Sequence, residues 1–137
     1  MGIVLDSTIL VAAERAGSSP RQVIGGIAAT LGDAEATLSV VTVVELAHGI
    51  ERANSEERRS KRSRFLEELL QELSVEPITV PIAIRAGKLD GALQAQGIRI
   101  SLGDLLIGAT ALELGYAVAT ANVRHFEMIP RLALHRF

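Results

Sequence analysis

Three carboxylates and one amide stand at the ends of predicted strands or the starts of predicted helices. Asp6 closes the first apolar run and Glu45 follows the second, while Asp104 lies in the first turn of a late helix. Asn122 directly follows the fourth apolar run. If the strands are parallel, their carboxyl ends share one edge of the sheet, which is where α/β proteins bind ligands. These four side chains are therefore expected to converge.

A group of carboxylates at one edge of a sheet favours a divalent cation. Helix N-termini keep such carboxylates ionised. Crowded negative charges still repel one another, and a bound cation removes that repulsion. Ligands that are all oxygen suit Mg²⁺ or Mn²⁺. Such ions activate a water and stabilise charge on phosphorus without a nucleophilic side chain, so the predicted reaction is hydrolysis of a phosphodiester.

The same residues also have a purely structural interpretation. The segment 42–45 spells the capping box T-x-x-E, in which Glu45 would only accept a backbone N–H at a helix start. The segment 101–104 has a similar S-x-x-D pattern, and Asp6 and Asn122 can be plain N-caps. Spacing alone leaves capping and chemistry open. The two roles are compatible, because one carboxylate oxygen can cap while the other binds a metal.

Apolar runs alternate with helical patterns along the chain. The predicted strands are 2–5, 36–41, 75–80, 116–120 and 132–136. The predicted helices are 7–15, 20–31, 42–53, 55–73, 81–96 and 102–114, with a helical turn at 122–128. This alternation predicts an α/β domain with a central, mainly parallel sheet of four or five strands flanked by helices.

The composition narrows the class of protein. The 137 residues are expected to form a single domain, 1–137, whose core is aliphatic because the chain has three Phe, one Tyr and no Trp. The absence of cysteine excludes disulfides, thiolate metal sites and cysteine nucleophiles. A net charge of −2 argues against nucleic-acid binding through positive charge alone, although bound cations would add charge. The first apolar stretch is interrupted by Asp6, so neither a signal peptide nor a membrane span is predicted, and a cytoplasmic protein is expected.

Four segments of the chain resemble PIN-domain proteins, in particular bacterial toxins of the VapC type. They are IVLDSTILVAAER, LSVVTVVELAHGIERA, ISLGDLLIGATALELG and TANVRHFEMIPRL, and in this order they span residues 3–132. The resemblance implies a Rossmann-like fold of three layers and the cleavage of RNA with Mg²⁺ or Mn²⁺. It also implies that the chain is the toxin of a type II toxin–antitoxin pair, is inhibited by a cognate antitoxin and forms a homodimer.

The resemblance assigns metal-binding positions to three acidic residues, namely Asp6, Glu45 and Asp104. Asn122 occupies the position at which many relatives carry a fourth acidic residue. Because an amide brings no charge, we expect one metal ion to bind well and a second to enter only with the RNA phosphate. Hydroxyl partners near the site are implied at Ser7, Thr8 and Thr120.

Contacts to RNA are predicted at Arg99, Arg124 and His125, which lie near loops of the same sheet edge. His125 can contact a phosphate or move a proton, or it is a surface histidine. The basic run 58–64 contacts an RNA backbone, or it forms a solvated helix face with the ion pairs Glu57–Lys61 and Arg64–Glu68, each four residues apart. The flanking glutamates favour the solvated face.

The apolar helix 20–31 has two interpretations. It is buried in the domain, or it forms a groove with helix 7–15 that an antitoxin segment covers. The sequence does not separate the two.

Three other functional classes are alternatives to a nuclease. A dinucleotide-binding domain needs a glycine-rich loop after the first strand, and no glycine stands between residues 3 and 16. An aspartate-nucleophile enzyme needs a second acid at the position of Thr8 or a late lysine, and the only lysines are Lys61 and Lys88. A catalytically degenerate PIN-like module that binds RNA or protein stays open, because Asn122 favours it while the three carboxylates do not.

Overall fold

Five parallel strands form one sheet in the computed structural model, which describes residues 1–137. The strands are β1 (Gly2–Leu5), β2 (Glu35–Ser39), β3 (Ser74–Glu76), β4 (Ala117–Thr120) and β5 (Leu134–Arg136). Their order in the sheet is β3-β2-β1-β4-β5, and every neighbouring pair is parallel. The first strand of the chain is therefore the central one, and Asp6 leaves the sheet at the middle of its carboxyl edge.

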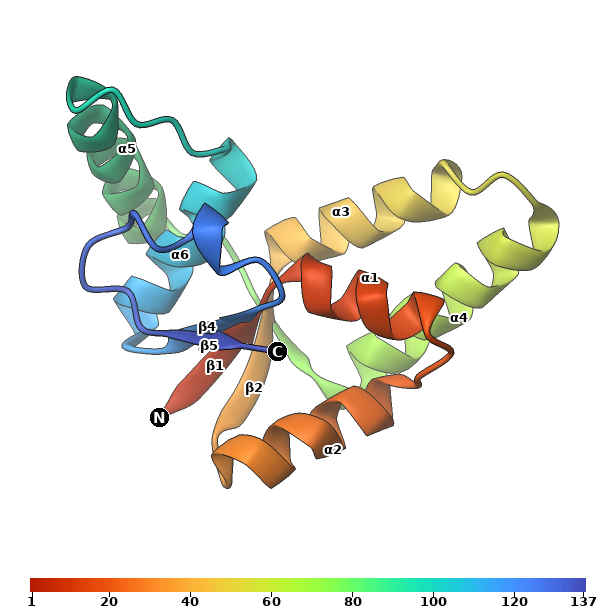
Figure 1. Ribbon diagram of the computed structural model, residues 1–137. Helices are drawn as coiled ribbons and strands as arrows, with labels where there is room; N and C mark the ends of the chain where they lie inside the picture. The colour runs from red at the N-terminus through yellow and green to blue at the C-terminus, as the bar shows by residue number, and fades with distance from the viewer.

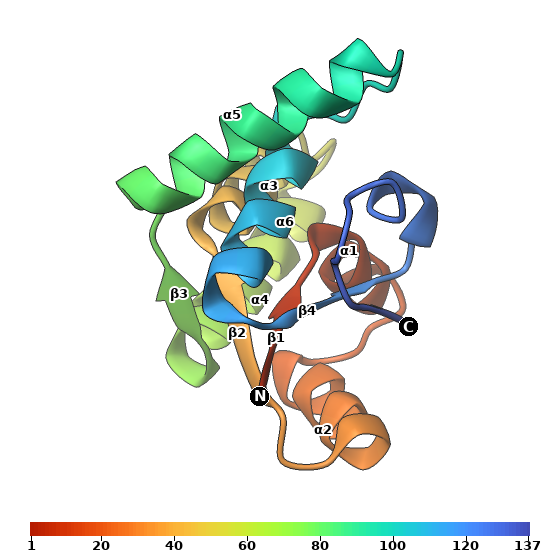
Figure 2. The ribbon, with the colours of Figure 1, turned by 90° about the vertical axis from the view of Figure 1, so that its left-hand side faces the viewer.

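Six helices cover both faces of this sheet, so the predicted three-layer α/β fold is confirmed. The helices are α1 (Ser7–Arg15), α2 (Pro20–Leu31), α3 (Val40–Glu51), α4 (Glu56–Glu72), α5 (Val80–Ala95) and α6 (Leu102–Leu114), with a 3₁₀ turn η1 (Val123–His125). Figures 1 and 2 show α5 and α6 on one side of the sheet and α1 and α2 on the other.

The pleat of β1 divides the core between these two faces. Ile3 and Leu5 point to one face and pack in a cluster with residues of α1, α2 and α4. Val4 points to the other face and packs with Ile107 of α6 and Phe126. All of β1 is buried, as expected for the central strand of a parallel sheet with helices on both sides.

The junction between β2 and α3 differs from the prediction. The strand ends at Ser39 rather than at residue 41, and Ser39 is the N-cap of α3, its Oγ accepting a hydrogen bond from Val41 N at 3.1 Å. Thr42, the predicted cap, lies inside the helix, fully buried, and its Oγ1 has no hydrogen-bond partner. The prediction was wrong because the β-branched run after Ser39 looks as much like a strand as like a helix start.

The third strand is also shorter than predicted. It ends at Glu76, because Pro77 has no N–H to donate to a neighbouring strand. Thr79 then caps α5, its Oγ1 accepting from Ile82 N at 3.3 Å. The predicted helical turn 122–128 is likewise reduced to Val123–His125.

The helix α2 buries its apolar side chains within the domain. Ile27 is 3% exposed, and Val23, Ile24 and Leu31 are partly buried against the cluster that contains Leu5. The rest of the helix is largely exposed, so burial explains its apolar character without a covering partner. None of the helices combines the length and the hydropathy that crossing a bilayer requires.

Candidate active site

The carboxylate of Asp6 is the most fixed acidic group of the sheet edge. The residue is 2% exposed, and its N–H donates to Ala119 O at 2.9 Å. Its Oδ2 accepts hydrogen bonds from Thr8 Oγ1 at 2.7 Å and from Thr120 Oγ1 at 2.9 Å. Asp6 precedes α1 but caps no backbone N–H with its side chain, so the plain N-cap interpretation was wrong. Two threonines instead hold the carboxylate in one orientation.

Glu45 approaches Asp6 from the second turn of α3. Ser7 Oγ donates a hydrogen bond to Glu45 Oε2 at 3.2 Å. Because α3 begins after Ser39, Glu45 is six residues from the N-cap and cannot close the capping box that the sequence suggested. Its carboxylate is therefore available for chemistry at the edge of the site.

Asp104 reaches the site from the first turn of α6. Ser101 caps this helix, its Oγ accepting from Asp104 N at 3.3 Å, so the predicted S-x-x-D cap is confirmed for the serine. The side chain of Asp104 is 17% exposed, and its Oδ2 lies 3.3 Å from His125 Nδ1. The backbone of Asp104 thus serves the cap, while its carboxylate faces the site.

Asn122 and His125 form a hydrogen-bonded pair beside Asp104. Asn122 Nδ2 lies 3.0 Å from His125 Nε2, and its side chain caps no backbone group of η1. If the amide donates to Nε2, the Nδ1–H of the neutral ring points at Asp104. The backbone N–H of Asn122 donates to Thr120 Oγ1 at 2.9 Å. The hydroxyl that orients Asp6 therefore also anchors the loop that carries Asn122.

The sequence did not predict that Asn122 and His125 would bond each other. Their i,i+3 spacing was the available signal, because side chains three residues apart lie side by side in a helical turn. His125 is more exposed than Asp104, at 52% of its side chain. Its position beside Asp104 agrees with the prediction that it lies at the active edge.

The three carboxylates influence one another electrostatically. Partial burial raises the pKa of Glu45, and the negative charges of Asp6 and Asp104 raise it further. The hydrogen bond from Ser7 lowers this pKa, but by less than the other effects raise it. Burial also raises the pKa of Asp104, and the charge of Asp6 adds to this effect. The edge of the sheet thus gathers three carboxylates, and His125 beside Asp104 offsets only part of their negative charge.

The donors of this edge fit a hard divalent cation, although they form no closed cage. Carboxylate and hydroxyl oxygens suit Mg²⁺ or Mn²⁺. No group of three or more His, Asp or Glu side chains is arranged so that it could hold one ion. Mg²⁺ commonly binds through one or two carboxylates and keeps several waters, so it needs no such cage. Asp6 would be the fixed donor for an ion of this kind, with Glu45 and Asp104 beside it.

Replacing Glu45 or Asp104 by its neutral amide isostere should stabilise the metal-free protein. The raised pKa values mean that ionising Glu45 or Asp104 costs more in the folded chain than in the unfolded chain. Folding free energy is therefore lost as the pH rises through these pKa values. We expect Glu45→Gln and Asp104→Asn to unfold at a higher temperature than wild type in EDTA near neutral pH. The gain should shrink as the pH falls and vanish below about pH 3, where both carboxyls are protonated in the folded and the unfolded chain. A lower melting temperature in EDTA at neutral pH would contradict this electrostatic interpretation.

Arg99 and Arg124, the predicted RNA contacts, are both exposed. Arg99 lies between α5 and α6, two residues before the cap at Ser101, and Arg124 lies in η1 beside His125. Neither arginine has a carboxylate within 4 Å. Both are free to meet a phosphate, and their role stays a prediction.

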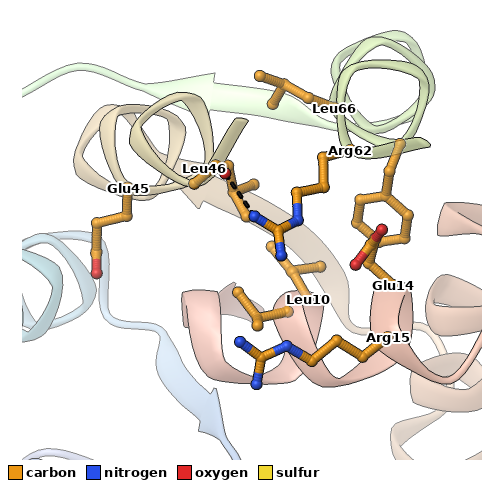
Figure 3. A pocket seen from close by; sticks show the side chains of 10 residues that line it. Leu10, Glu14, Arg15, Glu45, Leu46, Arg62 and Leu66 are labelled. Atoms are coloured by element: carbon orange, nitrogen blue, oxygen red, sulfur yellow. Dashed lines mark hydrogen bonds between the residues drawn. The ribbon is translucent and has the colours of Figure 1, made fainter. Parts of the chain in front are cut away.

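A pocket of about 150 Å³ borders the site on the side of Glu45 and lies between α1, α3 and α4. Figure 3 shows Glu14 and Arg15 of α1 and Arg62 of α4 around it. Arg62 Nη1 donates to Gly49 O at 2.6 Å, near the end of α3. The sequence did not predict this pocket, because it forms only when three separate helices pack together.

Comparison with known proteins agrees with the fold. The PIN domain family matches residues 3–132. The chain belongs to the PIN domain family. It is 30% identical over 132 residues to "Ribonuclease VapC1" of Rickettsia felis, covering 96% of this chain and 93% of that protein. It is 35% identical over 130 residues to "Ribonuclease VapC10" of Mycobacterium tuberculosis, covering 95% of this chain and 90% of that protein.

Solved structures share this architecture over the full chain. VapBC2 from Rickettsia felis, bound to a DNA fragment from its promoter, superposes with a TM-score of 0.86 at 22% identity, covering 100% of this chain and 99% of the other. VapBC-1 from nontypeable Haemophilus influenzae gives a TM-score of 0.82 at 25% identity, with 99% and 98% covered. The PIN-like fold that the motifs implied is confirmed.

Proposed function

We propose that this chain is a metal-dependent endoribonuclease and the toxin of a type II toxin–antitoxin pair. The observation that carries the proposal is the carboxylate of Asp6, buried at the centre of the sheet edge and held by two threonines. Glu45 and Asp104 flank it, and each has a raised pKa partly because of the charge of Asp6. The names of the ribonuclease relatives support RNA as the substrate.

Each residue of the site has a distinct part in this reaction. Asp6, Glu45 and Asp104 would hold Mg²⁺ or Mn²⁺ together, with one or two of them binding the ion directly and the rest binding it through water. The bound ion would supply an activated water and offset charge at phosphorus. Thr8 and Thr120 orient Asp6, and Ser7 orients Glu45. Asn122 and His125 line the edge beside Asp104, where an RNA phosphate would approach.

The partner of this chain is proposed to be a cognate antitoxin. Several similar solved structures are VapBC assemblies, and a further one is a toxin–antitoxin complex from Klebsiella pneumoniae, with a TM-score of 0.68 and 21% identity. A homodimer stays a prediction. Exposed apolar side chains on α5 and at the start of α6 offer a face for it, with Val80 71%, Ile84 53% and Leu102 70% exposed. A cytoplasmic location follows from the proposed RNA substrate.

The test is cleavage of RNA by the purified chain with Mg²⁺, with Mn²⁺ and with EDTA. The substrates should include a mixed single-stranded RNA and transfer RNA, because one relative is named "tRNA(fMet)-specific endonuclease VapC" (Salmonella typhimurium, 29% identical over 97 residues, 71% of each chain). Cutting that requires a metal supports the proposal. Cutting that persists in EDTA contradicts it.

Divalent metal should also stabilise the folded protein. A ligand that binds only the folded state at 100 times its Kd adds about 2.7 kcal/mol. We expect Mn²⁺ to raise the melting temperature by roughly 8 °C for a domain of this size. Asp6→Asn should remove most of this shift, while Asp33→Asn, which changes an exposed carboxylate between α2 and β2, should keep it. No shift in wild type, together with no cutting, would identify a catalytically degenerate binding module instead.

A further inference from the structure

Four arginines around the junction of α1 and α4 have no carboxylate partner. They are Arg15, Arg58, Arg62 and Arg64, and none of them lies within 4 Å of an acidic group. Arg58 contacts only Asn54 Oδ1, at 3.3 Å, and Arg62 contacts only the carbonyl of Gly49. Their charges are therefore not cancelled by direct ion pairs.

Three glutamates of α4 pair with other cations, namely Glu56, Glu57 and Glu72, while Glu67 and Glu68 have no cation within 4 Å. Lys61 Nζ lies 3.6 Å from Glu57 Oε1, so this predicted pair is confirmed, and Arg59 lies within 4 Å of Glu51 and Glu56. The other predicted pair, between Arg64 and Glu68, does not form. Of the two ion pairs that would neutralise the helix face 58–64, only Glu57–Lys61 is present in the structure.

These arginines line three adjoining hollows. Glu14 and Arg15 border all three of them. Arg62 borders both the pocket of Figure 3 and a hollow lined by Glu14, Arg15, Arg58, Lys61 and Arg62, which has no apolar side chain. The pocket of Figure 3 also reaches Glu45. A tract of positive charge therefore runs from the ends of α1 and α4 to the carboxylate site.

We propose that this tract, formed by Arg15, Arg58, Lys61, Arg62 and Arg64, binds the phosphate backbone of the RNA on one side of the scissile bond. The proposal rests on the proposed function. The negative edge formed by Asp6, Glu45 and Asp104 repels phosphates, and the whole chain has a net charge of −2. Attraction for a polyanion must therefore come from cations gathered elsewhere on the surface.

The tract favours RNA over an acidic protein segment as its occupant. Its cations lie on two helices and border three hollows, and only the pocket of Figure 3 has several apolar side chains in its lining. The hollow bordered by Arg58 has an entirely polar and charged lining, which offers nothing to the apolar side chains of a docked peptide. Glu14 and Glu68 also border the tract, so its cations must outweigh these two negative charges. The continuity with Glu45 places a bound strand on a path to the carboxylates.

The test is the salt dependence of binding to a fluorescently labelled single-stranded RNA, measured in EDTA so that metal-dependent cutting is prevented. Each phosphate contact contributes about 0.7 to the slope of log K against log salt for a single strand. We expect Arg15→Gln/Arg58→Gln to reduce the magnitude of this slope by roughly 1.4 and to raise Kd about tenfold at low salt. With Mg²⁺, KM should rise more than kcat falls. Arg62 is left intact because its bond to Gly49 O also supports α3.

The control is Arg85→Gln/Lys88→Gln, which removes the same charge from α5, on the other side of the sheet. It should leave the slope and Kd near the wild-type values. The proposal is overturned if both double variants behave alike, or if wild type binds no RNA in EDTA. It is also overturned if polyglutamate of matched length binds as tightly as RNA with the same dependence on Arg15 and Arg58. Because RNA binding is measured without metal, a failure of this proposal can be distinguished from a failure of the proposed function, which would appear as an absence of metal-dependent RNA cleavage.

Discussion

Asp6→Asn is expected to lower kcat/KM for RNA cleavage by about 10³-fold. Groups that orient a metal ligand typically contribute roughly 10–100-fold, and the ligand itself should contribute more. Asn keeps the shape of Asp, and its Oδ1 can still accept from Thr8 and Thr120. The fold should therefore survive, and the loss should come from the missing negative charge at the centre of the site.

The two threonines allow a graded version of this experiment. Thr8→Val and Thr120→Val each remove one hydrogen bond to Asp6 Oδ2, so each should lose roughly 10–100-fold. Cleavage rates and melting curves measured side by side will separate lost chemistry from lost folding. Asp33→Asn again serves as the matched control. An Asp6→Asn enzyme that keeps most of its activity would show that Asp6 is not the central ligand or that another nuclease contaminates the sample.

Phe126→Ala should lower the free energy of unfolding by about 3–5 kcal/mol. Phe126 is completely buried and packs with Val4, Val118 and Ile129 on the α6 face of the sheet. A loss of this size is a large part of the roughly 5–15 kcal/mol that stabilises a typical domain. Urea unfolding followed by circular dichroism will measure the change.

The matched control for this substitution is Phe137→Ala. Phe137 is 38% exposed, so its removal should cost far less than that of Phe126. Because Phe126 follows His125 directly, the core variant should also loosen the loop that holds Asn122 beside Asp104. A loss below about 1 kcal/mol at Phe126 would contradict the burial on which this prediction depends.

The sequence predicted the fold better than it predicted element boundaries. Apolar runs indicate the strands, and Ser101 and Gly115 mark the two ends of α6. The structure confirms these elements. The start of α3 was misplaced because Ser39 and Thr42 are both good caps. The choice between them depends on β2 pairing with its neighbours, in the register Leu38 to Leu5, which is a contact between distant parts of the chain.

The candidate site was predicted in its residues but not in its contacts. Asp6, Glu45 and Asp104 follow from the rule that parallel strands end at one edge. Which hydroxyl holds which carboxylate depends on rotamers fixed by packing, so the partnership of Thr120 with Asp6 came only from the structure. The positive tract was underestimated for a similar reason. Arg15 and Arg58 are far apart in sequence, and only the packing of α1 near α4 brings them to one hollow.

The central position of β1 has a consequence for synthesis of the protein on the ribosome. Asp6 is made well before Thr120, whose hydroxyl holds it and which lies 114 residues later in the chain. The central strand β1 has no neighbour on its β4 side until residues 117–120 have been translated. Contacts of such long range form late in folding. A nascent chain therefore cannot assemble the site beside the messenger and ribosomal RNA that surround it until β4 has left the ribosome, and catalytic competence should arise only after that point.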